Sequence, residues 1–200
     1  LLCLAPNSSY CYNYGVKMTQ IRPHSLNNIK LFIIVPAYNE EKVIGKVLKG
    51  LKVQKFINTK KEIVVVNDGS TDKTEEIAKK CNVTVLSHPL NRGLGGALGT
   101  GLEYARIKGA DIVITFDADD QHEPKDLKRL IEPILKNKAD FVIGSRLLKN
   151  SKMPMDRKLI NLLANIINFC LWSIWITDSQ SGLRALSKNA LKKIEIKMNK

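Results

Sequence analysis

The chain of 200 residues has few cysteines and few aromatic residues. Its four cysteines, Cys3, Cys11, Cys81 and Cys170, are scattered and show no Cys-x-x-Cys or Cys/His spacing, which argues against a zinc site and a disulfide framework. A reduced, cytosolic setting is therefore expected. Aromatic residues make up 6% of the chain and are dispersed, unlike the interleaved basic and aromatic residues of a nucleic-acid-binding surface.

Acidic residues are also in short supply, with 19 Asp and Glu against 32 Lys and Arg and a formal net charge of +13. This excess favours anionic partners, namely phosphorylated substrates, an acidic lipid surface or nucleic acid. A solvated, lysine-rich surface would give the same balance, so charge alone does not choose between these classes.

Apolar, β-branched runs alternate with helical patterns from about residue 28 onward. Strands are expected at 31–35, 62–66, 83–86, 111–116 and 141–143. Helices are expected at 40–53, from the turn at 67–72 to about 80, at 94–107 and at 126–136. Short, wholly apolar strands that alternate with helices predict an α/β fold with a parallel sheet covered on both faces. Ligands of such sheets bind beyond the carboxyl ends of the strands.

The first two expected strands end in polar turns. In the segment 36–40, Asn39 is a candidate cap for the next helix, and Ser70 or Thr71 could do the same in the segment 67–72. Ordinary strand–turn–helix punctuation explains most of these residues. It does not explain Asp68, which leaves its strand at the carboxyl end and could accept hydrogen bonds from a base or a ribose.

A glycine-rich segment at 91–101 resembles a dinucleotide-binding fingerprint, but Leu98 stands where glycine or alanine is needed. A Rossmann oxidoreductase is therefore disfavoured. Small residues recur four apart, at Gly95 and Gly99 and at Ala97 and Gly101, which predicts a helix that approaches the sheet closely.

The strongest chemical signal follows the fourth expected strand, where Asp117, Asp119 and Gln121 are spaced two apart. In an extended backbone, such residues point to the same side. Two carboxylates that converge repel each other unless a cation lies between them, and oxygen ligands favour Mg²⁺ or Mn²⁺. The alternative is a solvated acidic loop.

Five motifs in order, VPAYNE, VVNDGSTDKT, NRGLGGALGTGL, FDADDQH and GSR, closely resemble family-2 glycosyltransferases of the GT-A fold. The similarity extends over residues 30–190 and is greatest to dolichyl-phosphate mannose synthases and polyprenyl-phosphate glucosyltransferases. It implies an inverting, metal-dependent transfer of mannose or glucose from a GDP- or UDP-sugar to dolichyl or polyprenyl phosphate, with Mg²⁺ or Mn²⁺ as cofactor.

The resemblance also implies a role for each matched position. The nucleotide-sugar would be bound by Pro36, Ala37, Tyr38, Glu40, Asp68, Asp117 and Ala118. The metal would be held by Asp117, Asp119 and Gln121. The acceptor phosphate would be faced by Ser145, Arg146, Arg157 and Arg184. The catalytic set would comprise Asp117, Asp119, Arg146 and Asp178. The segment 178–184 matches a later family motif, with Leu183 in place of the usual aromatic residue.

A phosphate acceptor and a hydroxyl acceptor make different demands. A lipid phosphate is largely dianionic at neutral pH and needs positioning and charge compensation, whereas a hydroxyl needs a base such as Asp178. Transfer to a hydroxyl of a saccharide or lipid is therefore the first alternative. A non-catalytic nucleotide- or lipid-binding module is the second.

The most apolar stretch, residues 159–176, carries Asn161, Asn165 and Asn168 on one helical face. It is interpreted as a helix lying in the cytosolic membrane interface, with a buried core helix and a transmembrane span as alternatives. We expect three parts: an N-terminal extension at 1–28, with Met18 a possible true start, a nucleotide-sugar-binding core at 29–148, and an acceptor-side region at 149–200 that is cut short.

Overall fold

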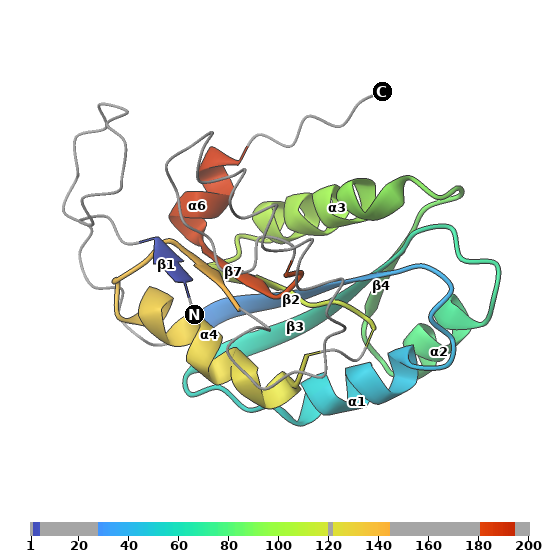
Figure 1. The fold of residues 1–200 in the computed structure, drawn as a ribbon, viewed down its shortest axis with the longest axis horizontal. Coiled ribbons are helices and arrows are strands. Elements are labelled where there is room, and N and C mark those ends of the chain that lie inside the picture. Colours follow the sequence, from blue (N-terminus) through green and yellow to red (C-terminus); the bar gives the residue numbers. More distant parts are fainter. Residues whose placement is uncertain (1, 5–27, 120–121, 145–180, 195–200) are drawn as a thin grey trace, which may run out of the picture.

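Seven strands form one sheet within the residues that the computed structural model describes, which are 2–4, 28–119, 122–144 and 181–194 (Figure 1). Their order across the sheet is β1-β6-β7-β5-β2-β3-β4. The strands are β1 (Leu2–Leu4), β2 (Ile29–Ala37), β3 (Thr59–Asn67), β4 (Thr84–Ser87), β5 (Ile112–Thr115), β6 (Phe141–Ile143) and β7 (Arg184–Ser187).

The strand directions confirm a mostly parallel sheet. Strand β2 pairs in parallel with β3 and with β5, and β3 pairs in parallel with β4. Strand β7 is antiparallel to both β5 and β6, so β6 runs in the same direction as β5. Two elements were not predicted from the sequence: β7, which lies between β5 and β6, and β1, which pairs antiparallel with β6.

Helices cover both faces of the sheet, as expected (Figure 1). One face is covered by α1 (Ile44–Val53), α2 (Thr74–Lys80) and α4 (Leu127–Leu135), which follows the 3-10 turn η1 (Pro124–Asp126). The other face is covered by α3 (Gly93–Ile107) and α6 (Lys188–Lys193). None of the helices described here combines the length and the apolar character that a membrane span requires, and the predicted interfacial helix at 159–176 lies outside the described residues.

Central strand β2 shows why the strands read as continuous apolar runs. Leu31, Ile33 and Val35 pack into the core beneath α1 and α4, whereas Phe32 and Ile34 pack into the core beneath α3. Because successive side chains of a strand point to opposite faces, a strand covered on both sides must be apolar at every position.

Helix α3 approaches the sheet closely because the residues that it buries are small. Ala97 and Gly101 are buried, and a Cβ on Gly101 would lie 2.2 Å from Ile34 Cγ2. Gly95, by contrast, is exposed, and a Cβ there would meet no atom within 4 Å. The predicted close approach is confirmed for Ala97 and Gly101, Gly99 is buried as well, and the prediction is wrong for Gly95.

Candidate active site

The predicted functional positions that fall within the described residues gather at one edge of the sheet. Because β2, β3 and β5 run in parallel, the residues that follow Ala37, Asn67 and Thr115 emerge at the same edge. Strand β7 runs in the opposite direction and begins there, since Arg184 pairs with Thr115. The segment 181–183 therefore also lies at the carboxyl edge of the parallel strands.

Two loops of this edge, which follow β2 and β3, hold each other in place. Asn39 donates its backbone N–H to Ser70 Oγ (3.0 Å), and Thr71 donates its N–H to Asn39 Oδ1 (2.9 Å). Glu40 donates its N–H to Thr74 Oγ1 (2.8 Å). The predicted caps are therefore wrong: Asn39 has a φ of 55° and binds the neighbouring loop, and α1 and α2 begin only at Ile44 and Thr74, without a side-chain cap.

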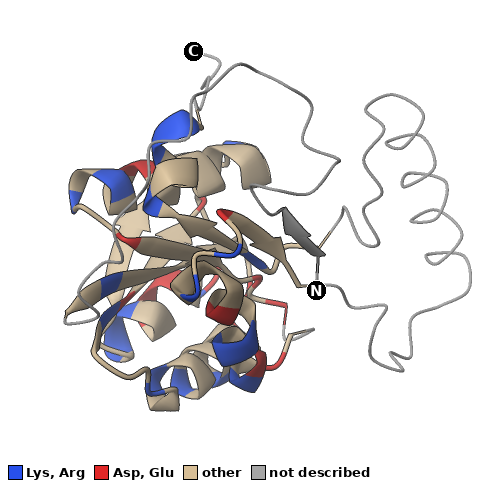
Figure 2. Cartoon of the chain, turned by 90° about the vertical axis from the view of Figure 1, so that its left-hand side faces the viewer, with Lys and Arg blue, Asp and Glu red and all other residues tan. Residues whose placement is uncertain are grey.

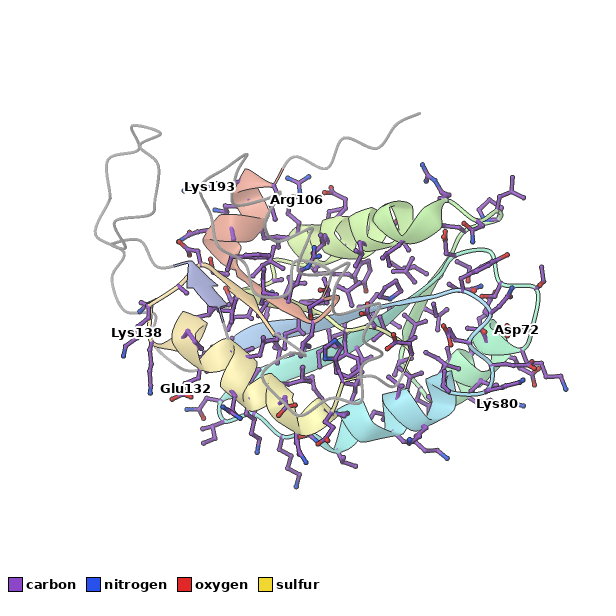
Figure 3. The ribbon with its side chains drawn as sticks, in the orientation of Figure 1. Asp72, Lys80, Arg106, Glu132, Lys138 and Lys193 are labelled. Atoms are coloured by element: carbon purple, nitrogen blue, oxygen red, sulfur yellow. The ribbon has the colours of Figure 1, made fainter. Side chains whose placement is uncertain are left out.

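Acidic side chains add further hydrogen bonds between the two loops. Asp72 accepts the backbone N–H of Glu41 (3.1 Å) and of Thr74 (2.9 Å), and Glu41 accepts the N–H of Lys73 (3.1 Å). Burial alone would raise the pKa of Asp72, but the hydrogen bonds from Thr74 and Glu41 outweigh it and hold the pKa below its usual value. In Figure 3, Asp72 lies beside α2, within this pair of loops.

The carboxyl group of Glu40 lies in a different electrostatic environment. Partial burial, with further contributions from the charges of Asp119 and Asp72, raises its pKa above the usual value. Asp119 itself is exposed. The carboxyl group of Glu40 therefore lies within the influence of two other carboxylates, one after β3 and one after β5, and a cation placed among them would relieve this repulsion.

Asp117 is seated against the segment that leads into β7. A Cβ on Gly182 would lie 1.9 Å from Asp117 Oδ2 and 2.0 Å from Oδ1, so only glycine leaves room for this carboxylate. Gly182 is fixed in turn, because Thr115 Oγ1 donates to its carbonyl oxygen (2.7 Å). The neighbouring Ser181 Oγ donates to the carbonyl of Gly144 at the end of β6 (2.5 Å).

The backbone after β5 is extended over fewer residues than the sequence predicted. Residues 116 and 117 continue from the strand, but Ala118 and Asp119 form a turn, so the alternation of an extended chain does not extend to Asp119. The described part of the chain contains no group of three or more His, Cys, Asp or Glu side chains arranged around a metal position. Two carboxylates that follow a buried strand nevertheless suit a hard divalent cation, and the expected third ligand, Gln121, lies outside the described residues.

Asp68 is almost completely buried, with an exposed fraction of 3%. Its Oδ1 lies 2.6 Å from His88 Nδ1 and accepts the backbone N–H of Arg92 at 2.9 Å. The other ring nitrogen of His88, Nε2, lies 2.8 Å from Thr100 Oγ1 on α3. Sequence reasoning missed His88 and Thr100. The pairing of Asn67 with Ser87 would have revealed His88, because it brings the next residues of β3 and β4 together.

The remaining predicted positions divide into two sets. Pro36 and Ala37 are the last two residues of β2 and are buried, Ala118 is buried in the turn that follows β5, and Tyr38 is 47% exposed. Arg184 begins β7, and its Nε donates to the carbonyl of Ser181 (2.9 Å). The other predicted residues, Ser145, Arg146, Arg157 and Asp178, lie outside the described residues.

A mostly parallel sheet with an acidic loop after β5 is the arrangement that the sequence predicted for the GT-A fold. The model of the glycosyl transferase family 2 matches residues 32–195, and the chain belongs to that family. An uncharacterised protein of Methanocaldococcus jannaschii is 49% identical over 86% of this chain and 70% of its own length. A UDP-N-acetylglucosamine–dolichyl-phosphate N-acetylglucosaminyltransferase of Methanococcus voltae is 42% identical over 81% of this chain and 71% of its own.

Solved structures show the same fold at lower identity. Glucosyl-3-phosphoglycerate synthase of Mycobacterium tuberculosis, crystallised with Mn²⁺ and UDP, matches with a TM-score of 0.63 and 23% identity over 80% of this chain. The same enzyme was crystallised with Mg²⁺ and UDP. The chain spans 57% of the length of that enzyme. The expected cofactor, Mg²⁺ or Mn²⁺, agrees with the ions in these structures.

Proposed function

We propose that this chain transfers a sugar from a nucleoside diphosphate sugar to dolichyl or polyprenyl phosphate, with the help of a divalent cation. The observation that carries the proposal is the position of the acidic loop. Asp117 lies against Gly182 at the end of β5, and Asp119 follows it. Asp68 lies at the end of β3, which is separated from β5 by β2 alone. This edge is where nucleotides bind to open parallel sheets.

The acceptor class is supported by the way that the relatives vary. Besides the N-acetylglucosaminyltransferase of Methanococcus voltae, the chain is 34% identical to a dolichol-phosphate mannosyltransferase of Pyrococcus furiosus, over 84% of this chain and 49% of that protein. The transferred sugar differs between these two names, and dolichyl phosphate is common to both. The donors to consider are therefore GDP-mannose, UDP-glucose and UDP-N-acetylglucosamine.

The residues of this chain suit such a reaction in two ways, by holding the cation and by compensating the charge of the acceptor. Asp117 and Asp119, with Gln121, would hold Mg²⁺ or Mn²⁺, which as a Lewis acid supplies stabilisation of the charge on the departing diphosphate. Arg184 begins β7 beside Thr115, so its guanidinium would compensate acceptor charge close to the same edge. Arg146 and Arg157 would add to this compensation.

A dianionic phosphate acceptor is already a nucleophile, so its attack on the anomeric carbon needs no general base. A single displacement inverts the configuration of that carbon. The apolar segment 159–176 would bring the enzyme to the cytosolic face of a membrane, where a lipid phosphate is presented. If the acceptor were a hydroxyl, Asp178 would be needed to remove its proton.

The test is a transfer assay with Mn²⁺, dolichyl phosphate and each of the three donors, in which labelled product is recovered in organic solvent. We expect product with one donor, none with EDTA, and at least a hundredfold loss in Asp119→Asn, on the order of the effect of one electrostatic contact in catalysis. Glu132→Gln removes one exposed carboxylate from α4, far from Asp72 in Figure 3, and serves as the matched control.

Dolichol without its phosphate separates the two acceptor classes. The proposal predicts no transfer to dolichol and full activity of Asp178→Asn with dolichyl phosphate. Transfer to dolichol that is lost in Asp178→Asn would establish the hydroxyl alternative instead. Activity retained in Asp119→Asn, or no transfer with any of the donors, would refute the proposed reaction.

A further inference from the structure

The carboxylate of Asp68 is held by one of its two oxygens. Both hydrogen bonds that the described residues donate to this carboxylate end on Oδ1, from His88 Nδ1 (2.6 Å) and from the backbone of Arg92 (2.9 Å). The side chains of Asp68 and His88 are only 4% and 8% exposed. The backbone of Asp68 is fixed as well, since its N–H donates to the carbonyl of Ala37 (2.9 Å). The carboxylate therefore cannot turn without breaking one of the two hydrogen bonds at Oδ1.

His88 is itself fixed from both sides. Its backbone N–H donates to the carbonyl of Asn67 (2.9 Å), and its Nε2 lies 2.8 Å from Thr100 Oγ1. A carboxylate oxygen accepts hydrogen bonds, so the N–H of the His88 ring is on Nδ1 and donates to Asp68 Oδ1. In the neutral ring, Nε2 is then an acceptor, and the hydroxyl of Thr100 donates to it. The chain Thr100–His88–Asp68 thus links α3, β4 and β3.

We propose that His88 is a positioning residue that commits Oδ1 of Asp68, leaves Oδ2 for the donor base, and thereby makes the site selective for uridine over guanosine nucleotides. This inference rests on the proposed nucleotide-sugar site. A carboxylate is recognised by N–H groups of a base. Uracil offers a single ring N–H between two carbonyl groups, which one oxygen satisfies. Guanine offers two adjacent donors, a ring N–H and an amino group, which pair best with both oxygens of a carboxylate.

The arrangement therefore penalises guanine more than uracil. To pair with both guanine donors, Oδ1 would have to accept a third hydrogen bond or give up His88 or Arg92, and the released donor would remain buried. A site that leaves a buried polar group without its partner discriminates strongly against the ligand concerned. Adenine and cytosine present a ring nitrogen that accepts, which an ionised carboxylate cannot satisfy.

The experiment measures the binding of UDP and of GDP to the whole chain in the presence of Mn²⁺, by calorimetry, for the wild type and three variants of His88. The wild type should bind UDP at least about tenfold more tightly than GDP, roughly the effect of one hydrogen bond to a charged group. His88→Phe should bring the ratio of the two affinities towards one, because Oδ1 is released.

Two amide variants distinguish positioning from mere filling of space. In His88→Asn, the side-chain amide nitrogen takes the place of Nδ1 and can still donate to Asp68, so the UDP-to-GDP ratio should be retained. In His88→Gln, the amide lies nearer the place of Nε2 and serves Thr100, so the ratio should fall as in His88→Phe. Thermal unfolding of each variant checks that the fold is intact, and the Asn and Gln pair remains informative if His88→Phe does not fold.

A wild type that prefers GDP, or a UDP-to-GDP ratio that is the same in all four proteins, would overturn the inference. Equal losses of affinity for both nucleotides in the variants would show that His88 only supports the fold. These outcomes are independent of lipid transfer. Failure of the transfer assay with an intact preference for UDP would refute the proposed acceptor and leave the role of His88 standing.

Discussion

Replacing Gly182 by alanine tests whether the close contact between Asp117 and Gly182 determines the geometry of the acidic loop. The added Cβ would lie 1.9 Å from Asp117 Oδ2 and 2.0 Å from Oδ1, whereas Cβ atoms essentially never come within 3.0 Å of a neighbouring atom. The carboxylate or the glycine backbone must therefore move by at least the difference, 1.1 Å. If the backbone moves, the hydrogen bond from Thr115 to Gly182 is strained as well.

The expected loss of activity is large because a displacement of this size removes Asp117 from its position. Misplacing a catalytic group by about 1 Å lowers the rate on the order of a hundredfold. The loss of stability should be smaller, about 1–3 kcal/mol, as for other insertions of a methyl group into a well-packed region. Activity and stability should therefore separate in this variant.

The assay compares kcat/KM for transfer from the preferred donor, together with the affinity for Mn²⁺ and nucleotide, in the wild type and Gly182→Ala. Gly95→Ala is the matched control, since a Cβ there meets no atom within 4 Å and α3 tolerates alanine well. We expect full activity of the control. If Gly182→Ala retained activity within about twofold of the wild type while folding normally, Asp117 would not need its observed position, and the reasoning would be refuted.

Three further predictions concern stability and are checked by urea unfolding. Gly101→Ala should lose about 1–3 kcal/mol, because its Cβ would lie 2.2 Å from Ile34 Cγ2 on the sheet. Asp72→Asn should lose about 1 kcal/mol at pH 7; since the pKa of Asp72 is lowered in the folded state, the difference from wild type should shrink as the pH falls below the usual value of 3.8, and a constant difference would contradict this. Lys61 donates to three carbonyls at the end of α1 at 2.6–2.8 Å, so Lys61→Met should lose about 1–2 kcal/mol. Burial, with the charge of Lys52, lowers the pKa of Lys61, so wild type should gain stability relative to Lys61→Met as the pH rises towards 10.5.

The sequence predicted the central strands and the helices because their apolar periodicity is local. It did not predict β7, whose four residues contain only two buried side chains, Ala185 and Leu186, and which is defined by pairing with β5 and β6 rather than by its own pattern. Strand register was also inaccessible. Without the pairing of Asn67 with Ser87, nothing connects Asp68 to His88, 20 residues further along the chain.

The helix starts were misplaced for a related physical reason. Asn39 is a residue type that caps helices, and a local reading assigns it to the next helix in the chain. In the fold, a neighbouring loop competes for the same oxygen, and Asn39 Oδ1 accepts the backbone N–H of Thr71. Polar motif residues at the ends of parallel strands are thus shared between loops that are distant in sequence, which a single-chain pattern cannot reveal.

Two acidic residues at this edge of the sheet, Asp72 and Glu40, have pKa values shifted in opposite directions. Asp72 has a lowered pKa because backbone N–H groups bind its carboxylate, so its charge is already compensated by the loops. Glu40 contributes its backbone N–H to the hydrogen bonds between the loops that follow β2 and β3. Burial, with the charges of Asp119 and Asp72, raises the pKa of its carboxyl group. Environments that push neighbouring carboxyl groups apart in pKa mark the groups with different roles. A cation bound beside Asp119 would oppose the contribution that the charge of Asp119 makes to the raised pKa of Glu40, whereas the contribution of burial would remain.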